Sequence, residues 1–203
     1  MVDQDCLTVA DTAAADALPS ATRILRAAND AYNENAVLPL RLGTVAEQAN
    51  VSRALIYSHF HDQYELVHSL LLSHLSLVDP AISAAMSSET DFSALAHALA
   101  GTLFDHYIAH GLILANATQD DFLNHKLPAQ LASRLSSGLK NLAQHARKAY
   151  GFERREAIAA IILLAVIPEQ SARLVRMGRI SEDVGRAGVA RGIRLAVHTF
   201  RQS

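Results

Sequence analysis

The chain has 203 residues, enough for one or two domains with a substantial hydrophobic core. Half of its residues are hydrophobic, 19% are charged and 5% are aromatic, a globular composition that excludes a disordered or fibrous protein. The formal net charge of −2 at pH 7 gives no overall basic signature, which counts against nucleic-acid binding unless a specific motif outweighs it. Alanine and leucine dominate while glycine and proline are sparse, so the composition favours helices over sheets.

The cysteine content and the apolar runs of the sequence indicate the cellular compartment of the protein. Cys6 is the only cysteine, so we expect neither an intramolecular disulfide nor a thiolate metal cluster. Met1 to Asp16 carry acids where a signal peptide has basic residues. The longest apolar run, Ala157 to Pro168, is short against the roughly 20 residues that span a bilayer. The sequence therefore predicts a cytoplasmic protein with no membrane partner.

The first third of the chain predicts short helices. Residues 1–19 are small and acidic without a periodic stripe and are interpreted as a mobile arm. Ser20 is a candidate N-cap for a helix that ends near residue 35, before Pro39. Two short helical segments follow, separated by Asn50, which tolerates the left-handed backbone conformation, and Ser52 can cap the second of them.

The rest of the chain predicts longer helices. Asp62 and Glu65 form a capping-box pattern at the start of the first one, which Asp79-Pro80 should interrupt or kink. Pro128 and Pro168 should likewise kink or break the helices that contain them. Glycines and acidic starts delimit further helices at 91–110, 111–118, 121–150, 153–177 and 181–201. We therefore predict an all-α fold of about nine helices.

Residues 42–60, LGTVAEQANVSRALIYSHF, have the layout of a helix-turn-helix: a helix of two turns, a tight turn and a second short helix. Such a second helix fits the DNA major groove, where its N-terminal residues reach base edges. Inward packing should fix the crossing of the two helices through Val45, Ala49, Val51, Ile56 and Phe60. The outward-facing residues are then Ser52, Arg53, Ala54, Leu55, Tyr57 and His59.

The longer segment VAEQANVSRALIYSHFHDQYEL resembles the signature of the TetR-like (tetracycline-repressor-like) transcriptional regulators. The resemblance covers about residues 21–71. It implies a three-helix DNA-binding head over residues 20–65, joined to a larger helical domain over residues 66–203 that binds an effector and forms a dimer. The family usually has glycine at the turn, where this chain has Asn50, a residue able to adopt the required backbone.

The resemblance also implies roles for individual head residues. Ser52, Arg53, Ala54 and Leu55 would face bases, Tyr57 and His59 would contact phosphates, and Arg41 and Thr44 would lie near the DNA backbone. Gln63 stands where the family often has a phosphate-binding lysine, and it can donate a hydrogen bond without bringing a charge. Arg53 is the only recognition-helix residue able to make a bidentate contact to guanine. Because the head has few cations, we expect weak non-specific affinity and a shallow salt dependence.

For the second domain, the resemblance implies a small, often hydrophobic effector bound between helices. The candidate pocket residues are Phe104, Tyr107, His110, Asn116, Phe122, His145 and Glu169, all of which could instead be surface or core residues. The resemblance further implies a homodimer through the helices at about 153–177 and 181–201, with packing within one chain as the alternative. Gly185, Gly188 and Gly192 would then lie on one side of the last helix, where another helix can approach closely.

The predicted function is that of a repressor whose two recognition helices occupy successive major grooves of double-stranded operator DNA, about 34–36 Å apart. A small-molecule effector would lower operator affinity through its differential affinity for two states, with the helix from Asp62 as the lever. The alternative is a DNA-binding activator or architectural factor with no small-molecule response. No catalytic constellation or cofactor motif is present, so no enzyme and no cofactor are predicted. His106 and His110 could ligate a metal, but without a third ligand at a fixed spacing they are interpreted as core or solvated histidines, and no metal site is predicted.

Overall fold

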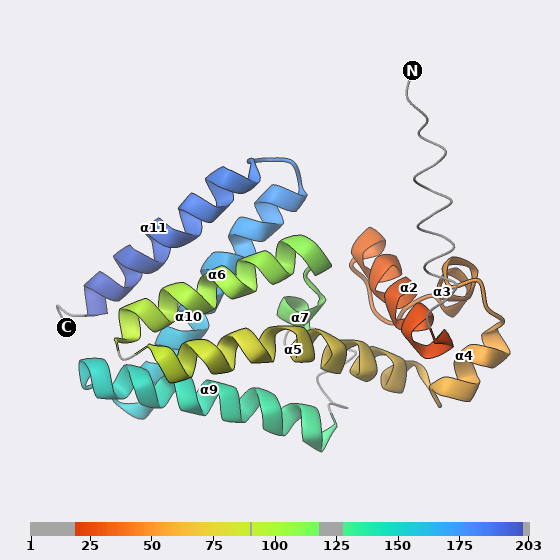
Figure 1. The fold of residues 1–203 in the computed structure, drawn as a ribbon, viewed down its shortest axis with the longest axis horizontal. Helices are drawn as coiled ribbons and strands as arrows, with labels where there is room; N and C mark the ends of the chain where they lie inside the picture. Colours follow the sequence, from red (N-terminus) through yellow and green to blue (C-terminus); the bar gives the residue numbers. More distant parts are fainter. Residues whose placement is uncertain (1–18, 90, 118–127, 201–203) are drawn as a thin grey trace. The chain divides into compact units, whose positions relative to one another are not determined.

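A computed structural model describes residues 19–89, 91–117 and 128–200, which form nine helices and no strand (Figure 1). The predicted all-α fold is therefore confirmed. The predicted arm at 1–19 lies almost entirely outside the described residues, as do Phe122 and the expected start of the helix at 121. The helices are α2 (Ser20–Asn35), α3 (Leu42–Gln48), α4 (Arg53–His59), α5 (Gln63–Ser88), α6 (Phe92–His110), α7 (Ile113–Asn116), α9 (Ala129–Tyr150), α10 (Arg154–Arg176) and α11 (Glu182–Phe200).

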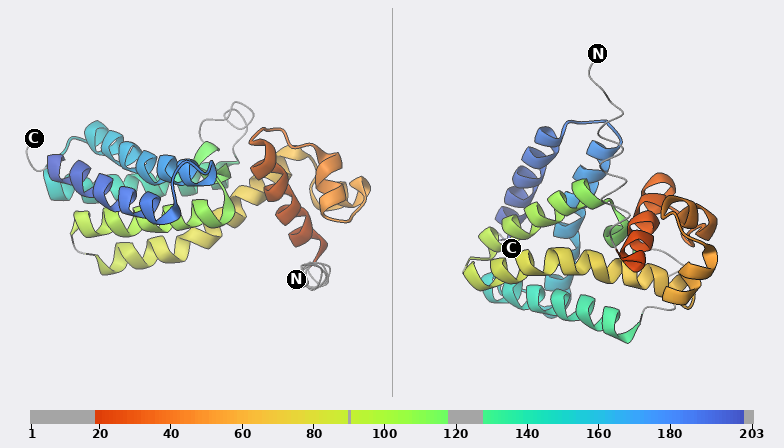
Figure 2. Two further views of the ribbon diagram at one scale, coloured as in Figure 1. Left: turned by 90° about the horizontal axis from the view of Figure 1, so that it is seen from above. Right: turned by 45° about the vertical axis from the view of Figure 1, so that its right-hand side comes forward.

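The helices divide into two compact units. The division falls inside α5, between Leu71 and Leu72, whereas the sequence predicts it between residues 65 and 66. The first unit contains α2, α3, α4 and the start of α5, and the second contains the rest of α5 together with α6, α7, α9, α10 and α11. Figure 2 shows the helices of each unit from two further directions.

The first unit is a three-helix arrangement in which α2 packs against both α3 and α4, and α3 packs against α4. Its core contains fully buried Ile24, Ala28, Val45 and Leu66, with Ile56 of α4 1% exposed. α3 and α4 have only seven residues each, too few to be stable in isolation. Tertiary packing of their apolar sides therefore holds the unit together.

Helix boundaries in this unit follow local capping chemistry. The Ser52 hydroxyl accepts a hydrogen bond from the Leu55 amide at 3.1 Å, so the predicted N-cap of α4 is confirmed. The Asp62 carboxylate likewise accepts from the Glu65 amide at 2.8 Å. The predicted cap at Ser20 is wrong: Pro19 is the N-cap of α2, and its carbonyl accepts from the amides of Thr22 and Arg23. The Ser20 hydroxyl is instead hydrogen-bonded to His59.

The turn between α3 and α4 has the backbone that the sequence predicts. Asn50 adopts a φ of 52°, in the left-handed region that asparagine tolerates better than most residues. Its amide donates to the Glu47 carbonyl at 3.1 Å, and the Val51 amide donates to the Ala46 carbonyl at 3.0 Å. These bonds satisfy the C-terminal carbonyls of α3 and let the chain reverse within a few residues.

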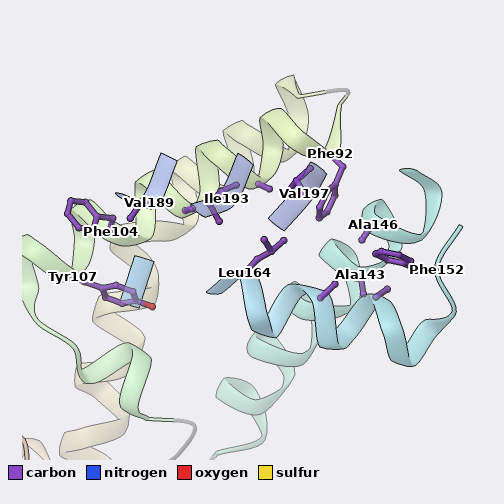
Figure 3. Close-up of a cluster of buried hydrophobic side chains, with 14 of the residues drawn as sticks. Phe92, Phe104, Tyr107, Ala143, Ala146, Phe152, Leu164, Val189, Ile193 and Val197 are labelled. Carbon is purple, nitrogen blue, oxygen red and sulfur yellow. The ribbon is translucent and has the colours of Figure 1, made fainter. Parts of the chain in front are cut away.

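In the second unit, α10 packs against α6, α9 and α11, and α11 also packs against α6. Buried side chains from these helices form one hydrophobic cluster, with Phe104 and Tyr107 at one end and Phe152 at the other (Figure 3). Fully buried Phe104 and Ala157 belong to it, with Ile193 1% exposed. α10 is thus the central contact of this unit, as its long apolar run requires.

Proline positions differ in part from expectation. Pro80 lies inside α5 and Pro168 inside α10, and both helices continue past them, so a break at either position is wrong. An interior proline removes one hydrogen bond of the helix. Pro168 is buried, so packing of α10 on its neighbours compensates for that loss. Pro128 is the N-cap of α9, which begins at Ala129, where its missing amide has no helical partner to lose.

The surroundings of the three glycines of α11 differ. A Cβ added at Gly185 would lie 2.6 Å from Val175 Cγ2 and 3.1 Å from Phe104 Cζ, and one at Gly192 would lie 3.1 Å from Ile167 Cγ2. A Cβ at Gly188 would meet nothing within 4 Å. Gly185 and Gly192 therefore serve close helix packing within the chain, whereas Gly188 does not.

We expect Gly185→Ala to destabilise the protein, because the new methyl group overlaps Val175 and Phe104, two side chains held in the core. The overlap should cost about 1–3 kcal/mol, more than the gain of about 1 kcal/mol in helix propensity. Thermal unfolding followed by circular dichroism measures the effect. Gly101→Ala, in α6 with nothing within 4 Å, is the matched control and should unfold at the same temperature or higher. Equal behaviour of the two variants would contradict the packing described here.

Candidate functional site

The two faces of α4 have opposite character. Ile56 is buried, as are Phe60 at the helix end and Val45 and Ala49 in the preceding segment, whereas Val51 is half-buried. The predicted inward packing is therefore confirmed for four of its five residues and in part for the fifth. The outward face carries exposed Ser52, Arg53, Ala54, Tyr57 and His59, with Leu55 half-buried. Tyr57 is 54% exposed.

Several predicted DNA-binding residues meet at one shallow depression on the first unit. It is formed by the loop before α3, the start of α3, and α4 with the first residue of α5. The lining residues are Pro39, Leu40, Arg41, Leu42, Gly43, Thr44, Glu47, Arg53, Tyr57 and Gln63. Five of the nine predicted residues, Arg41, Thr44, Arg53, Tyr57 and Gln63, thus share this surface. Ser52 lines an adjoining depression, again beside Arg53, while Ala54, Leu55 and His59 line neither.

The seating of Arg53 depends on a glycine that the sequence motif does not single out. A Cβ added at Gly43 would lie 2.5 Å from Arg53 Nη2 and 3.4 Å from its Cζ. The guanidinium group therefore rests directly over the first turn of α3. The sequence offers one signal for this contact, the small residues that precede the turn. The contact between Gly43 and Arg53 itself depends on how α3 and α4 cross.

Charge on this surface is mixed. Arg41 and Arg53 supply two exposed cations, and Glu47 lines both depressions beside Arg53. A carboxylate on the same surface reduces the positive potential that a phosphate or base edge would meet. The surface thus offers guanidinium, hydroxyl and amide groups rather than a strong positive field.

Two predicted phosphate-contacting side chains have distinctive settings in the unbound head. His59 Nε2 is joined by a hydrogen bond of 2.6 Å to Ser20 Oγ at the start of α2. Gln63 Oε1 is buried and has no hydrogen-bond partner in the part of the chain that the structure describes. A buried amide oxygen of this kind costs free energy unless another group comes to satisfy it. The Gln63 oxygen is an acceptor and needs a donor group, whereas His59 already has a partner in Ser20.

The candidate effector residues of the second unit separate into different groups. Phe104 is fully buried in the core, with the Arg186 guanidinium 5.2 Å from its ring centroid. Tyr107 is buried as well, and burial together with the nearby Glu169 carboxylate raises the pKa of its hydroxyl. His145 lies on α9 with Nδ1 2.9 Å from the Asn141 carbonyl. Phe122 is outside the described residues.

Asn116 and Glu169 come together through Arg173, a residue for which the sequence predicted no role. The Arg173 guanidinium donates to Asn116 Oδ1 at 3.0 Å and to Glu169 Oε1 at 2.9 Å. Glu169 is 8% exposed, so its charge is stabilised mainly by this ion pair and by a further bond from Gln170. Arg173 lies four residues after Glu169 on α10, a spacing that is recognisable in a helix.

An apolar cavity lies elsewhere in the same unit, between α6, α9, α10 and α11. Its volume is small, about 60 Å³. All of its lining side chains are hydrocarbon, and none of the candidate effector residues is among them. They are Phe92, Leu95, Ala96, Leu99, Ala100, Leu103, Leu142, Ile161, Leu164, Ala165, Pro168 and Ile193.

His110 belongs to a cluster with His106 and with His74 of α5, a residue for which the sequence predicted no role. His74 Nδ1 lies 2.9 Å from His106 Nε2, and both rings are buried. Burial, with repulsion from neighbouring histidines, lowers the pKa of His74 and of His106 to about 4, so both imidazoles are neutral at pH 7. No spacing rule connects position 74 to positions 106 and 110, because they lie on different helices.

Comparison with known proteins finds similarity to solved structures. Neither a protein-family model nor a curated protein matches the sequence. Among solved structures, a TetR-like transcriptional regulator from Rhodococcus is 15% identical, with a TM-score of 0.67 over 89% of this chain and 98% of that chain. A TetR variant from Acinetobacter baumannii in complex with minocycline is 16% identical, with a TM-score of 0.61 over 91% and 97% of the two chains.

A third structure, the transcriptional regulator FadR from Bacillus subtilis in complex with stearoyl-CoA, is 15% identical, with a TM-score of 0.58 over 85% of this chain and 96% of that chain. These chains are matched over nearly their whole lengths, so the likeness extends through both compact units. At such identities the likeness concerns the arrangement of the helices. The chain has the TetR-like fold.

Proposed function

We propose that the chain is a cytoplasmic, homodimeric regulator of transcription that binds operator DNA through its helix-turn-helix. A small, largely hydrophobic effector releases it from the operator, so it acts as a repressor. The observation that carries the proposal is the shared depression of Arg41, Thr44, Arg53, Tyr57 and Gln63 beside the exposed face of α4. The TetR-like fold supports it, since the similar structures are described as transcriptional regulators.

Base recognition would rest mainly on Arg53. It is the first residue of α4, the end of a recognition helix that reaches base edges. Its planar guanidinium can donate two hydrogen bonds to guanine O6 and N7, a contact worth about 1–3 kcal/mol of discrimination. Ser52, Ala54 and Leu55 would add a hydroxyl contact and apolar contacts to thymine methyl groups.

Phosphate binding would rest on few charges. Arg41 is the second cation of the depression, while Thr44, Tyr57, His59 and Gln63 would donate neutral hydrogen bonds. Neutral donors release no counterions when they bind, so they add affinity without adding salt dependence. The Glu47 carboxylate would further weaken non-specific attraction between the protein and the DNA phosphates. A regulator of this kind gains from joining two heads, because the second contact becomes intramolecular.

The effector is expected to be apolar where it enters the second unit. The cavity between α6, α9, α10 and α11 has only hydrocarbon side chains in its lining, so a polar group there would lose its hydration without compensation. The similar structures with minocycline and stearoyl-CoA support a ligand-binding role for this fold. Tyr107, His110, Asn116 and Glu169 remain candidates for contacts to a polar end of the effector.

Dimerisation is proposed through α10 and α11, because one side of each carries exposed apolar residues in the single chain. Ile162, Leu163 and Val166 of α10 are 52%, 66% and 41% exposed, and Leu195 of α11 is 69% exposed. Gly188 adds a position without a side chain on α11, where a Cβ would meet nothing. Such a patch marks an interaction surface, and a second copy of the chain covers it with matching chemistry.

A bilayer is the other apolar environment to consider. Within the described residues, α5 and α10 are long and apolar enough to cross a membrane by length and composition alone, a criterion that core helices of globular proteins also meet. Burial of one face of α10 against three other helices favours a protein partner on the other face. The mass of the protein in solution, with and without lipid vesicles, separates the two environments.

The DNA-binding proposal is tested by selecting bound duplexes from random DNA with the full chain and measuring affinities by fluorescence anisotropy. We expect two inverted half-sites about 10 base pairs apart, centre to centre. Arg53→Ala should reduce discrimination at one guanine of each half-site by about 5- to 150-fold, the equivalent of about 1–3 kcal/mol. Arg154→Ala, an exposed arginine of α10, is the control and should leave discrimination unchanged. Failure to enrich any sequence would overturn the proposal.

Gln63→Lys should strengthen DNA binding, because it adds one cation at the rim of the depression. The slope of log affinity against log salt should steepen by about 0.9 for each additional phosphate that the protein neutralises. The measurement is a salt titration of operator affinity for both proteins. Gln144→Lys, an exposed position of α9 outside the proposed dimer interface, supplies the matched added charge and should leave the slope as it is. A Gln63→Lys slope equal to that of the unsubstituted protein would place residue 63 away from phosphate.

Leu163→Glu should convert the protein into a monomer, since it places a charge in the centre of the proposed interface. Light scattering coupled to gel filtration measures the mass. Leu77→Glu on α5 is the matched control: Leu77 is 57% exposed and lies outside α10 and α11, so this variant should remain a dimer. If the unsubstituted protein is a monomer, or if it is recovered bound to added lipid vesicles, the proposed interface is contradicted.

A further inference from the structure

The space left by the missing side chain of Gly43 is occupied by the guanidinium group of Arg53. Gly43 is the second residue of α3, and Arg53 is the first residue of α4. A Cβ added at Gly43 would lie 2.5 Å from Arg53 Nη2, 3.4 Å from Cζ and 3.7 Å from Nε, so the whole end of this side chain lies over one residue. At Gly185 and Gly192 the corresponding space is filled by hydrocarbon side chains. Gly43 differs from both because it accommodates a charged group of an exposed residue.

The same contact lies at the border between the two depressions of the first unit. Gly43, Glu47 and Arg53 line both of them. One depression continues over the turn toward Ser52, and the other continues along α4 toward Tyr57. The Arg53 side chain is therefore accessible from either side, at the place where the first turns of α3 and α4 meet.

The position of this guanidinium group is limited by space and not by a bond. Among the described residues, none is hydrogen-bonded or ion-paired to the Arg53 side chain. Its N–H groups, which form a planar fork, are thus available to a ligand. A long side chain that already has a restricted position loses less conformational entropy when it binds. The room over Gly43 therefore favours one placement of the donors without using any of them.

A methyl group at residue 43 would displace the guanidinium group by a distance that matters for hydrogen bonding. Moving Arg53 Nη2 from 2.5 Å to an ordinary contact of 3.4 Å requires a shift of about 0.9 Å. Hydrogen bonds from N–H to oxygen span only about 2.7–3.2 Å, so this shift breaks at least one of two bonds to a base edge. The displaced atoms are the end of a flexible side chain, so the helices themselves need not move.

We propose that Gly43 is a specificity-determining residue of the DNA-binding surface: because it lacks a side chain, it sets the place from which Arg53 recognises one guanine of each half-site. This inference rests on the proposed DNA-binding function. The group recognised is the major-groove edge of guanine, with O6 and N7 as the two acceptors. Gly43 acts through Arg53 and contacts no base, so it is a positioning residue.

The test is a double-mutant cycle on the duplex that the unsubstituted full chain selects. Fluorescence anisotropy measures the affinity for this duplex and for one with adenine in place of the guanine that Arg53→Ala no longer distinguishes. Gly43→Ala should lower the preference for guanine by at least about fivefold, or about 1 kcal/mol. In the Arg53→Ala background the same substitution should change the preference by less than about twofold, because no guanidinium group remains to be displaced. A purely structural effect of residue 43 would appear equally in both backgrounds.

Three further measurements separate the positioning of Arg53 from effects on the fold and on DNA binding. Gly43→Ala should unfold at the same temperature or higher, because alanine has the greater helix propensity. Gly138→Ala in α9, where an added Cβ meets nothing within 4 Å, is the matched control and should keep the guanine preference. Without DNA, NMR relaxation of the Arg53 Nε–H group should show a restricted side chain that becomes mobile in Gly43→Ala. Arg154, an exposed arginine of α10, is the mobile reference.

The proposal is overturned if Gly43→Ala keeps or increases the guanine preference, or if it lowers the preference equally in the Arg53→Ala background. It is also overturned if Arg53 Nε–H in the unsubstituted, unbound protein is as mobile as that of Arg154. Selection of no duplex at all would overturn the DNA-binding proposal and this one with it. A restricted Arg53 that Gly43→Ala releases would then show that the error lies in the function and not in the contact between the two residues.

Discussion

The middle of α10, residues 157–168, is apolar around its whole circumference, so it must be covered on more than one side. α6, α9 and α11 cover one side and form the core with it. The other side leaves Ile162 and Leu163 half or more exposed in the single chain. The same helix also walls the apolar cavity through Ile161 and Leu164. One segment thereby determines the core, the cavity and the surface proposed to meet a second copy.

The two units stabilise their functional surfaces in different ways. In the first unit, short helices are fixed by single local contacts, such as the Ser52 cap and the left-handed Asn50. Exposed polar side chains of this unit can therefore be substituted without disturbing the buried residues beneath them. In the second unit, close helix contacts such as Gly185 against Phe104 leave little room for change. Polar groups there are tied into pairs, as Glu169 is with Arg173.

Local features were predictable from the sequence, and features that depend on helix crossings were not. The turn at Asn50, the cap at Ser52 and the inward packing of Ile56 follow from rules acting over a few residues. Ser20 failed as a cap because Pro19, whose own conformation is fixed, occupies that position. The helices continue through Pro80 and Pro168, since packing outweighs one lost hydrogen bond. The lining of the cavity and the meeting of His74 with His106 arise between helices, where sequence spacing carries no information.

Under the proposed function, the acidic Glu47 beside Arg53 has a consequence for how the protein finds its operator. Proteins held to DNA by many phosphate contacts slide along it between random encounters. A DNA-binding surface that carries a carboxylate such as Glu47 would be held too weakly to slide far between encounters. The search would then proceed by repeated detachment and short hops, with brief stays at most positions. Long residence would be confined to sequences that engage Arg53 in both heads at once.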